Sequence, residues 1–172
     1  HAHFGEGEGP GFTVHASDIN DEALGRLRDG IYPRTALRRD GDEFHESLLK
    51  RHVVHSDERS VTIDPALLAR ISVHHLNFFL DPLDAIPDGL DLVFFRNTLL
   101  YASMEKRDLI VARIAEKIRP GGALFLATSE LPFVHHRDLR LEEIGRAYFM
   151  TRSDPSFAGR SGEEPIAPRN AS

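Results

Sequence analysis

The sequence predicts an α/β fold with a mostly parallel, twisted sheet, and three observations support this prediction. Short apolar segments alternate with segments of helical periodicity, as in chains whose strands are joined by crossover helices. Residues 90–95 are nearly all apolar, which is typical of a strand whose two faces are both covered. The last expected strand, residues 146–151, is predicted to lie antiparallel at the end of the sheet.

The first elements follow from the residues at their boundaries. Residues 5–11 are rich in glycine and glutamate and predict a loop. Residues 12–17 combine β-branched and aromatic side chains and predict a strand that ends at Asp18. Asn20 is a suitable N-cap for the helix that follows, because acidic residues come directly after it and favour the first helical turn. Gly30 is expected to end that helix.

The region after this helix is charged and shows little periodicity. We expect a small inserted subdomain over residues 33–70, with short strands at 48–54 and 60–63. A solvated surface excursion is an equal alternative, because the charged run that begins this region has no apolar face.

The second half of the chain has a sharper pattern. Residues 71–76 predict a strand that leads to Asn77, and residues 123–127 predict another buried strand. Between them Ser103 is expected to cap a helix that extends to Ile118. The Pro-Gly-Gly of residues 120–122 is expected to stop this helix.

Composition limits the class of protein. With 172 residues, 41% hydrophobic and 28% charged, the chain is expected to form one domain over residues 1–152. Residues 153–172 lack periodicity and predict a disordered tail or linker.

A net charge of -6 argues against nucleic acid as a partner. The absence of cysteine excludes disulfides and thiolate zinc sites and permits a reducing compartment. There is no apolar run of about 18 residues, so no membrane-spanning helix is expected.

Polar side chains stand at three expected strand ends: Asp18, Asn77 and Arg96 with Asn97. In open α/β sheets, ligands bind beyond the carboxyl ends of the strands, and an acidic residue there can accept hydrogen bonds from ribose hydroxyls. This placement favours a nucleotide-like ligand. Helix capping by Asp18 is an equally good explanation on position alone.

Four segments together resemble the CheR-type chemotaxis receptor methyltransferases. They occur in the order of that family and cover about residues 12–150. The segment DLVFFRNTLLYAS is the most specific of them, whereas the Pro-Gly-Gly element is common to many methyltransferases. The segments are HASDINDEALGRLRDGIYP (15–33), HHLNFFLDP (74–82), DLVFFRNTLLYAS (91–103) and RPGGALFLATSE (119–130).

The resemblance implies a Rossmann-like class I methyltransferase sheet and a cytoplasmic enzyme that uses S-adenosylmethionine. Its substrates would be glutamates in the cytoplasmic region of chemotaxis receptors, and it would not insert into the membrane. A role for Ser129 and Glu130 is only suggested. The resemblance implies that Asp18 holds the ribose, Asn77 and Phe78 lie against the adenine, Phe95 and Arg96 contact the cofactor near the methyl group, and Arg96 and Tyr101 face the substrate carboxylate.

Two alternatives apply to the residues expected at the substrate. Arg96 could instead form an ion pair at the strand end, and Tyr101 could be a core aromatic. The chain also has ten histidines. Neighbouring residues of a strand point to opposite faces, so His74 and His75 cannot share one ion, and we expect no metal site.

The chain also departs from the family pattern. The family's first strand, its Gly-rich loop and an N-terminal helical domain are missing, and we expect the chain, which begins at His1, to be a fragment. The glycines of residues 5–11 precede the strand that carries Asp18, so we interpret them as a connector. Phe95 stands where the family signature has cysteine.

Three functions therefore stand side by side. The first is glutamate methylation. The second is a non-catalytic module that docks receptors, which the missing Gly-rich loop suggests. In some relatives the inserted subdomain binds receptor tails by adding a strand. The third is a methyltransferase acting on another substrate class, since a fold alone does not determine the substrate.

Overall fold

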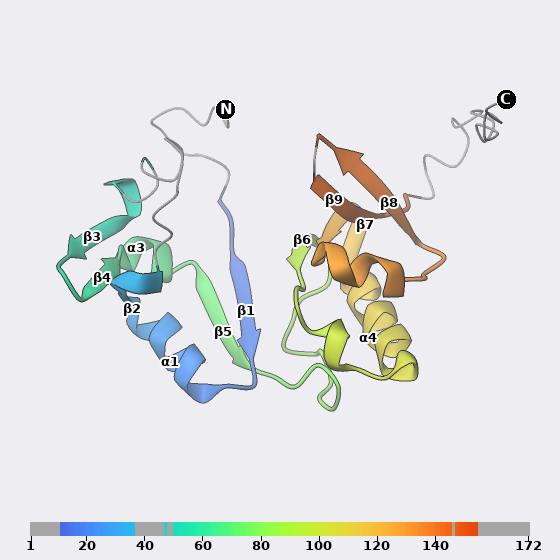
Figure 1. Cartoon of the computed structure of the whole chain (residues 1–172), viewed down its shortest axis with the longest axis horizontal. Helices are drawn as coiled ribbons and strands as arrows, with labels where there is room; N and C mark the ends of the chain where they lie inside the picture. The colour runs from blue at the N-terminus through green and yellow to red at the C-terminus, as the bar shows by residue number, and fades with distance from the viewer. Residues whose placement is uncertain (1–10, 37–46, 48–49, 146, 155–172) are drawn as a thin grey trace, which may run out of the picture. The chain divides into compact units, whose positions relative to one another are not determined.

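The computed structural model describes residues 11–36, 47, 50–145 and 147–154. They fall into two compact units, one up to Asp81 and one from Pro82 (Figure 1). Most of the loop expected at residues 5–11 and nearly all of the tail expected from residue 153 lie outside the described residues. Each unit is described by itself below.

A parallel strand pair and one helix form the main part of the first unit. Strand β1 (Val14–Asp18) pairs with β5 (Ile71–His75), and helix α1 (Asp21–Asp29) connects β1 to the elements that follow. The helix begins and ends as the sequence predicts. The Asn20 side chain accepts hydrogen bonds from two backbone N–H groups of the first turn, and Gly30 ends the helix at φ 65°. A Cβ atom at Gly30 would come within 2.3 Å of Leu68 Cδ1, so this position requires glycine.

A small antiparallel sheet occupies the region where an inserted subdomain is expected. Its strands are β2 (Ile31–Pro33), β4 (Ser60–Ile63) and β3 (Val53–Ser56), in the order β2-β4-β3. The short helices η1 (Arg34–Ala36) and α3 (Pro65–Leu68) flank it. Of the strand expected at residues 48–54, only the end is confirmed: residues 50–52 are helical, and Val53 and Val54 begin β3. The Lys-Arg run at this point favours a helix over a strand.

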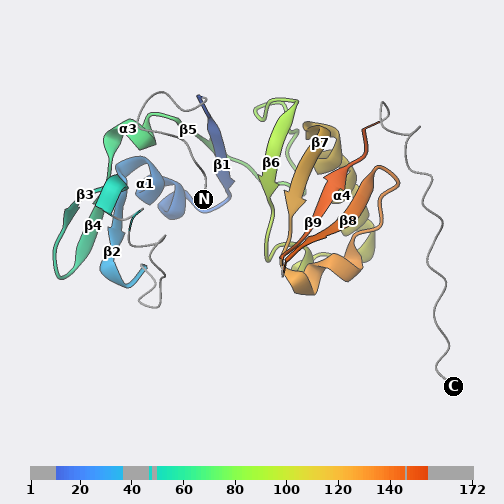
Figure 2. The ribbon, with the colours of Figure 1, turned by 90° about the horizontal axis from the view of Figure 1, so that it is seen from above.

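The second unit is a four-stranded mixed sheet with a helix on one face (Figure 2). Strands β6 (Leu90–Phe94) and β7 (Ile118–Phe125) are parallel, and helix α4 (Met104–Lys117) connects them. Strands β9 (Ala147–Arg152) and β8 (Leu139–Ile144) continue the sheet antiparallel in the order β6-β7-β9-β8. The short helices η2 (Leu99–Tyr101) and η3 (Thr128–Phe133) follow β6 and β7.

The core of this unit lies between α4 and the sheet. The α4 residues Ile110, Val111 and Ile114 are at most 3% exposed, and Leu124 on β7 is fully buried. The helix begins after Ser103, as expected, but the Ser103 side chain makes no capping hydrogen bond.

The Pro-Gly-Gly element does not separate the helix from the strand. Helix α4 ends at Lys117 and β7 begins at Ile118, so residues 120–122 lie inside the strand, where its register with β6 shifts. A Cβ atom at Gly122 would come within 2.6 Å of Ile118 Cγ2 and 2.9 Å of the Leu90 carbonyl oxygen. Close backbone approach, rather than helix termination, therefore explains this glycine.

The sheets differ from the prediction in three respects. Strand β8 was not expected. The described pairings are parallel only for β1–β5 and β6–β7, so the fold is mixed α/β rather than mostly parallel. Strand β6 was expected to be covered on both faces, but Leu92 and Phe94 are 58% and 69% exposed.

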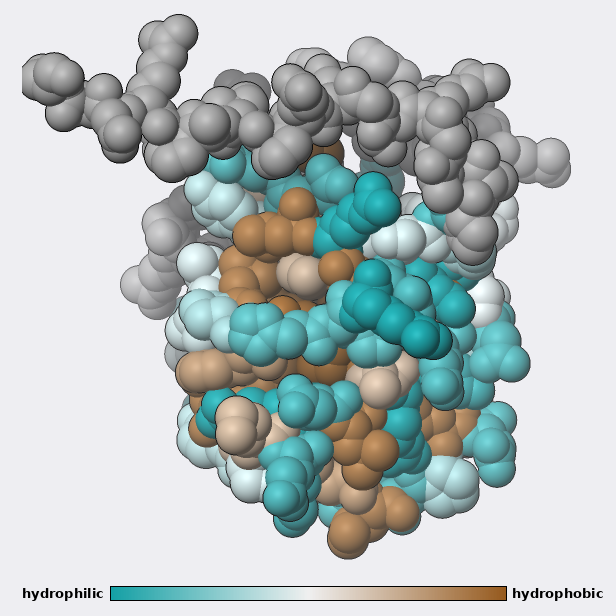
Figure 3. Space-filling model, turned by 90° about the vertical axis from the view of Figure 1, so that its right-hand side faces the viewer, coloured by the Kyte–Doolittle hydropathy of each residue, from teal (hydrophilic) through white to brown (hydrophobic). Residues whose placement is uncertain are grey.

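The exposed residues of β6 belong to a sheet face that α4 does not cover. Phe94, Phe125 and Phe149 form a row across three neighbouring strands, with ring centres 4.8 and 5.2 Å apart. On the face shown in Figure 3, hydrophobic patches lie among hydrophilic residues. Among the described residues, no helix is long and apolar enough to cross a membrane.

Candidate active site

Asp18 and Asn77 lie at the same end of the first unit's parallel pair. Asp18 is in register with His75, and the N–H of Leu76 donates to the Asp18 carbonyl oxygen at 3.0 Å. Asn77 follows one residue later. Two of the expected ligand-binding residues are thus brought together at the carboxyl ends of β1 and β5, where ligands bind in open α/β sheets.

Helix capping does not account for the Asp18 carboxylate. Asn20 caps α1, and Asp18 Oδ1 accepts a single hydrogen bond, from the Asn20 N–H at 2.9 Å. No other donor to this carboxylate is present in the part of the chain that the structure describes. The side chain is exposed, so it can accept hydrogen bonds from two neighbouring hydroxyls of a sugar.

A tight turn holds Asn77. Its Oδ1 accepts from the Phe79 N–H at 2.9 Å, and its own N–H donates to Asp81 Oδ2 at 2.7 Å. These bonds reverse the chain after β5 and leave Phe78 half-buried beside the strand end. The Asn77 amide nitrogen remains as a donor for a ligand.

Arg96 and Tyr101 begin and end the loop that follows β6 in the second unit. Arg96 is exposed, and its guanidinium makes no ion pair or hydrogen bond with any described residue. Tyr101 is 87% exposed. Neither alternative interpretation holds within the described residues, since Arg96 is not paired at the strand end and Tyr101 is not in the core.

Phe95 differs from the other expected site residues. Its side chain is only 7% exposed, and its N–H donates to the Phe125 carbonyl oxygen at 2.9 Å. It extends the pairing of β6 with β7 by one residue. The ring is therefore mainly part of the core.

Sequence reasoning only suggested a role for Glu130, which is the fully buried charged residue of this unit. Its Oε2 accepts from the N–H of Asn97 at 2.8 Å and of Ala127 at 3.1 Å, and its Oε1 accepts from the N–H of Leu99 at 2.8 Å. Two of these donors belong to the loop between Arg96 and Tyr101.

Arg107 on α4 contacts the same loop and was missed altogether. Its Nε donates to the Leu99 carbonyl oxygen at 2.8 Å, and its Nη2 lies 3.4 Å from the Leu100 carbonyl oxygen. Nothing in its sequence surroundings distinguishes it from other arginines of an exposed helix face.

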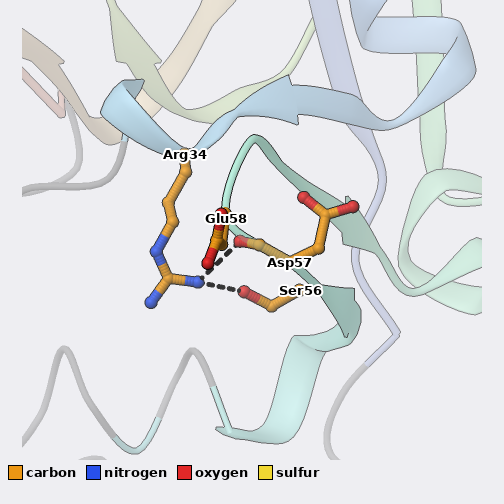
Figure 4. Close-up of a pocket in the computed structure, with 4 residues that line it drawn as sticks. All are labelled: Arg34, Ser56, Asp57 and Glu58. Atoms are coloured by element: carbon orange, nitrogen blue, oxygen red, sulfur yellow. Dashed lines mark hydrogen bonds between the residues drawn. The ribbon is translucent and has the colours of Figure 1, made fainter.

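A shallow pocket in the small sheet is lined by Arg34, Ser56, Asp57 and Glu58 (Figure 4). Arg34 Nη1 donates to Ser56 Oγ at 2.6 Å and to the Asp57 carbonyl oxygen at 3.0 Å, which ties η1 to the β3–β4 turn. The backbone N–H groups of Ser60 and then Arg59 hold the pKa of the Asp57 carboxyl below its usual range. Arg34 is already hydrogen-bonded to the turn, and the carboxylates of Asp57 and Glu58 would repel an anion. We therefore interpret the pocket as part of a structural turn and not as an anion-binding site.

The histidine of β1, His15, pairs with one of the two histidines of β5, His74. His15 Nδ1 lies 3.1 Å from His74 Nε2, and the 5.4 Å between ring centres is what two imidazoles give when they meet end to end. This geometry is a hydrogen bond between two rings. The described residues contain no group of three or more metal-ligating side chains.

Comparison with known proteins places the chain in a family. The model of the family described as "CheR methyltransferase, SAM binding domain" matches residues 2–148. The chain belongs to this CheR family. The resemblance expected from the four segments is thereby confirmed, and the family description names the same cofactor, S-adenosylmethionine.

Curated relatives agree with the family. The chain is 31% identical to chemotaxis protein methyltransferase 1 of Pseudomonas aeruginosa over 120 residues, which are 70% of this chain and 42% of that protein. It is 28% identical to the chemotaxis protein methyltransferase of Escherichia coli over 128 residues, or 72% of this chain and 43% of that protein. This CheR chain thus spans about two fifths of the length of its relatives.

Solved structures are less similar. A S-adenosylmethionine-dependent methyltransferase, SibL in its apo form, has a TM-score of 0.39 and 15% identity, covering 84% of this chain and 51% of that chain. The CheR assignment therefore rests on sequence. The roles of Asp18 and Asn77 in the first unit, and of Arg96 and Tyr101 in the second, remain predictions.

Proposed function

We propose that this CheR chain carries cofactor- and substrate-binding residues of a cytoplasmic protein-glutamate O-methyltransferase that acts on chemotaxis receptors. The family membership and the names of the relatives support this proposal. The observation that carries it is the pair Arg96 and Tyr101, which are exposed on a loop whose backbone is held by buried contacts.

The first unit would hold the adenosine part of S-adenosylmethionine. The exposed Asp18 carboxylate has acceptor sites left for the two ribose hydroxyls. Asn77 and Phe78 would lie against the adenine, with the Asn77 amide nitrogen as donor. The family resemblance assigns Phe95 and Arg96 to the cofactor nearer to its sulfonium.

The reaction requires alignment more than acid–base chemistry. The bound cofactor supplies a methyl group on a sulfonium, which a carboxylate oxygen can displace in line. A glutamate side chain has a reference pKa of about 4.3, so it is already the nucleophile at neutral pH and needs no general base. Holding the reacting groups in line can contribute about 7–11 kcal/mol.

Arg96 and Tyr101 are suited to this alignment. A guanidinium offers paired, planar donors that fit a carboxylate, and the Tyr101 hydroxyl can orient the other oxygen. Binding must not be too tight, because stabilising the ground state and the transition state equally leaves the chemical step no faster. An exposed arginine with no partner among the described residues meets this requirement.

Substitution of Arg96 tests the proposal. In the intact protein, Arg96→Ala should lower the transfer of radiolabelled methyl groups from S-adenosylmethionine to receptors by about 100-fold, the loss expected when a reacting group is misplaced. The control is Arg140→Ala, which removes an exposed arginine from β8 and should leave the rate unchanged. An undiminished rate in Arg96→Ala would overturn the proposal.

Strand edges are relevant to the complete family fold. In the described part of the chain, β1 pairs only with β5, and β6 pairs only with β7. The family pattern includes a further strand and a Gly-rich loop, and an edge of this kind is where a strand can be added to a sheet.

Docking of receptor tails would add to catalysis rather than replace it. Strand β3 lies at an edge of the small sheet, and Val54 on it is 59% exposed. An extended peptide can add a strand to such an edge.

A further inference from the structure

The loop between Arg96 and Tyr101 is held from two sides by charged side chains that are distant in the sequence. Glu130 binds backbone N–H groups of the loop, and Arg107 binds backbone carbonyl groups. Leu99, at the centre of the loop, has both its N–H and its carbonyl oxygen bound in this way and is fully buried.

Glu130 replaces a missing local cap. The first N–H groups of a helical turn have no partner within the turn, and the preceding side chain usually supplies one. Thr98 occupies the N-cap position of η2 but makes no side-chain capping bond. Glu130 accepts from the Leu99 N–H instead, across 31 residues of sequence. Both of its oxygens act as acceptors, as in a carboxylate.

Arg107 satisfies the other end of the same turn. Its guanidinium lies at the carbonyl oxygens of Leu99 and Leu100, where a positive charge is favoured. It also lies over the Phe133 ring, 4.0 Å from the centroid. Phe133 belongs to η3, the element that carries Glu130. Glu130 and Arg107 therefore hold the turn from two sides, and we call this pair the clamp. Both depend on η3, which carries Glu130 and places Phe133 under Arg107.

The clamp also holds the left-handed backbone conformation of Asn97. Asn97 has φ 61°, in the left-handed region, which asparagine adopts more readily than most other residues apart from glycine. Its N–H is bound to Glu130 Oε2. Because Asn97 directly follows Arg96, this conformation sets the direction in which the chain leaves Arg96 towards Tyr101.

Stability alone is a weak reason for a buried carboxylate. Replacing buried charge with apolar groups of similar volume often leaves a protein equally or more stable. What three directed hydrogen bonds provide instead is a single conformation of the loop, and preorganised loops favour alignment of reacting groups.

We propose that Glu130 and Arg107 are positioning residues, which fix the loop so that Arg96 and Tyr101 present their polar groups to the substrate carboxylate in one arrangement. This inference rests on the proposed function, in which Arg96 and Tyr101 bind that carboxylate. Neither Glu130 nor Arg107 needs to touch the substrate.

Glu130→Gln in the intact protein tests the clamp, because glutamine keeps the shape but turns one acceptor into a donor. At saturating S-adenosylmethionine the methyl-transfer rate should fall by about 10- to 100-fold, as for other misplaced groups. The dissociation constant for S-adenosylmethionine, measured by calorimetry, should rise by a smaller factor than the rate falls, because the ribose and adenine contacts of Asp18 and Asn77 are untouched and only the Arg96 contact near the sulfonium is displaced. Glu142→Gln, an exposed glutamate on β8, is the matched control and should keep the wild-type rate.

Hydrogen exchange provides a readout independent of activity. In Glu130→Gln, the amides of Asn97 and Leu99 should exchange at least about tenfold faster, whereas the amides of Leu124 and Met150 in the sheet should not change. A merely structural role would accelerate all four. Equal acceleration, or a wild-type transfer rate with unchanged loop amides, would overturn the inference.

A second variant covers the case in which Glu130→Gln does not fold. Arg107 is only half-buried, and Arg107→Lys keeps the charge while losing the paired donors. It should give the same fall in rate with an equally small change in cofactor affinity. If Arg96→Ala keeps full activity, the proposed function fails. If Arg96→Ala is inactive while Arg107→Lys is fully active, only the clamp is wrong.

Discussion

The turns after β1 and β5 in the first unit and the loop after β6 in the second all present polar side chains at strand ends, but they are held in different ways. Asp18 and Asn77 are fixed by hydrogen bonds that reach two to four residues along the chain. The loop after β6 depends on Glu130, which is 33 residues from Asn97 and 31 from Leu99.

The first two turns are therefore determined by residues close to them in the sequence, whereas the loop after β6 is determined by a residue far from it. A turn with its own Asp or Asn can form as soon as its strand ends, because each of these residues carries the acceptor that its own turn needs. The loop after β6 can take its final form only when α4 and η3 are packed beside it. We therefore expect the two regions to respond differently to substitutions.

The largest effect is expected at a position where two backbones approach in the second unit. Gly122→Ala would place a Cβ atom 2.6 Å from Ile118 Cγ2 and 2.9 Å from the Leu90 carbonyl oxygen. The free energy of unfolding should fall by about 1–3 kcal/mol, as in other overpacked sites. Urea denaturation followed by NMR signals of β7 measures it.

A matched glycine in the first unit should give the opposite sign. Gly25 lies inside α1, and no atom lies within 4 Å of a Cβ built there. Gly25→Ala should therefore stabilise the helix, by about 0.5–1 kcal/mol. Equal destabilisation by the two variants would show that the close contact at Gly122 is relieved by movement of β7.

The next effect concerns helix caps. Asn20→Ala removes hydrogen bonds to the N–H groups of Glu22 and Ala23 at 2.9 and 3.2 Å, and should cost about 1 kcal/mol. Ser103→Ala should cost much less, since the Ser103 side chain makes no capping bond. Denaturation of the two variants under the same conditions tests this ranking, and a larger loss for Ser103→Ala would contradict it.

The smallest effect is the pH dependence of the β3–β4 turn. Backbone donors from Ser60 and Arg59 hold the pKa of Asp57 below its usual range. The folded state therefore takes up this proton less readily than the unfolded state. The resulting stability is present above the ordinary pKa of aspartate, about 3.9, and is lost as the pH falls through the lower folded value.

An NMR titration of the Asp57 carboxyl measures this shift directly. The acid side of the stability profile should become flatter in Asp57→Asn, which cannot titrate. A titration midpoint at or above the ordinary aspartate value would show that the turn does not favour the charged form.

Local signals explain why much of the fold could be predicted. Asn20 and Gly30 mark the ends of α1 because capping preferences depend on the residue itself. Strand β6 is a mainly apolar segment, and β5 carries apolar residues at Ile71 and Val73. The positions of Arg96 and Tyr101 follow from the order of motifs in one family, and the exposure of both agrees with the expected roles.

The failures share a physical cause. Strand β8 is stabilised by pairing with β9, and its own alternation breaks at two adjacent glutamates. Gly122 was interpreted as part of a helix stop because the neighbouring Leu90 carbonyl comes from a strand 32 positions earlier. Glu130 and Arg107 likewise act on a loop that only the folded unit brings to them.

The strand order of the second unit has a consequence for its biosynthesis. Strand β8 is made before β9, yet β9 lies between β7 and β8 and is the strand with which β8 pairs. Arg152, at the end of β9, also donates to the Glu116 carbonyl oxygen at 3.1 Å, next to the end of α4. A nascent chain therefore cannot close this sheet until Arg152 has emerged from the ribosome, and until then β7 exposes an edge on which other chains can pair.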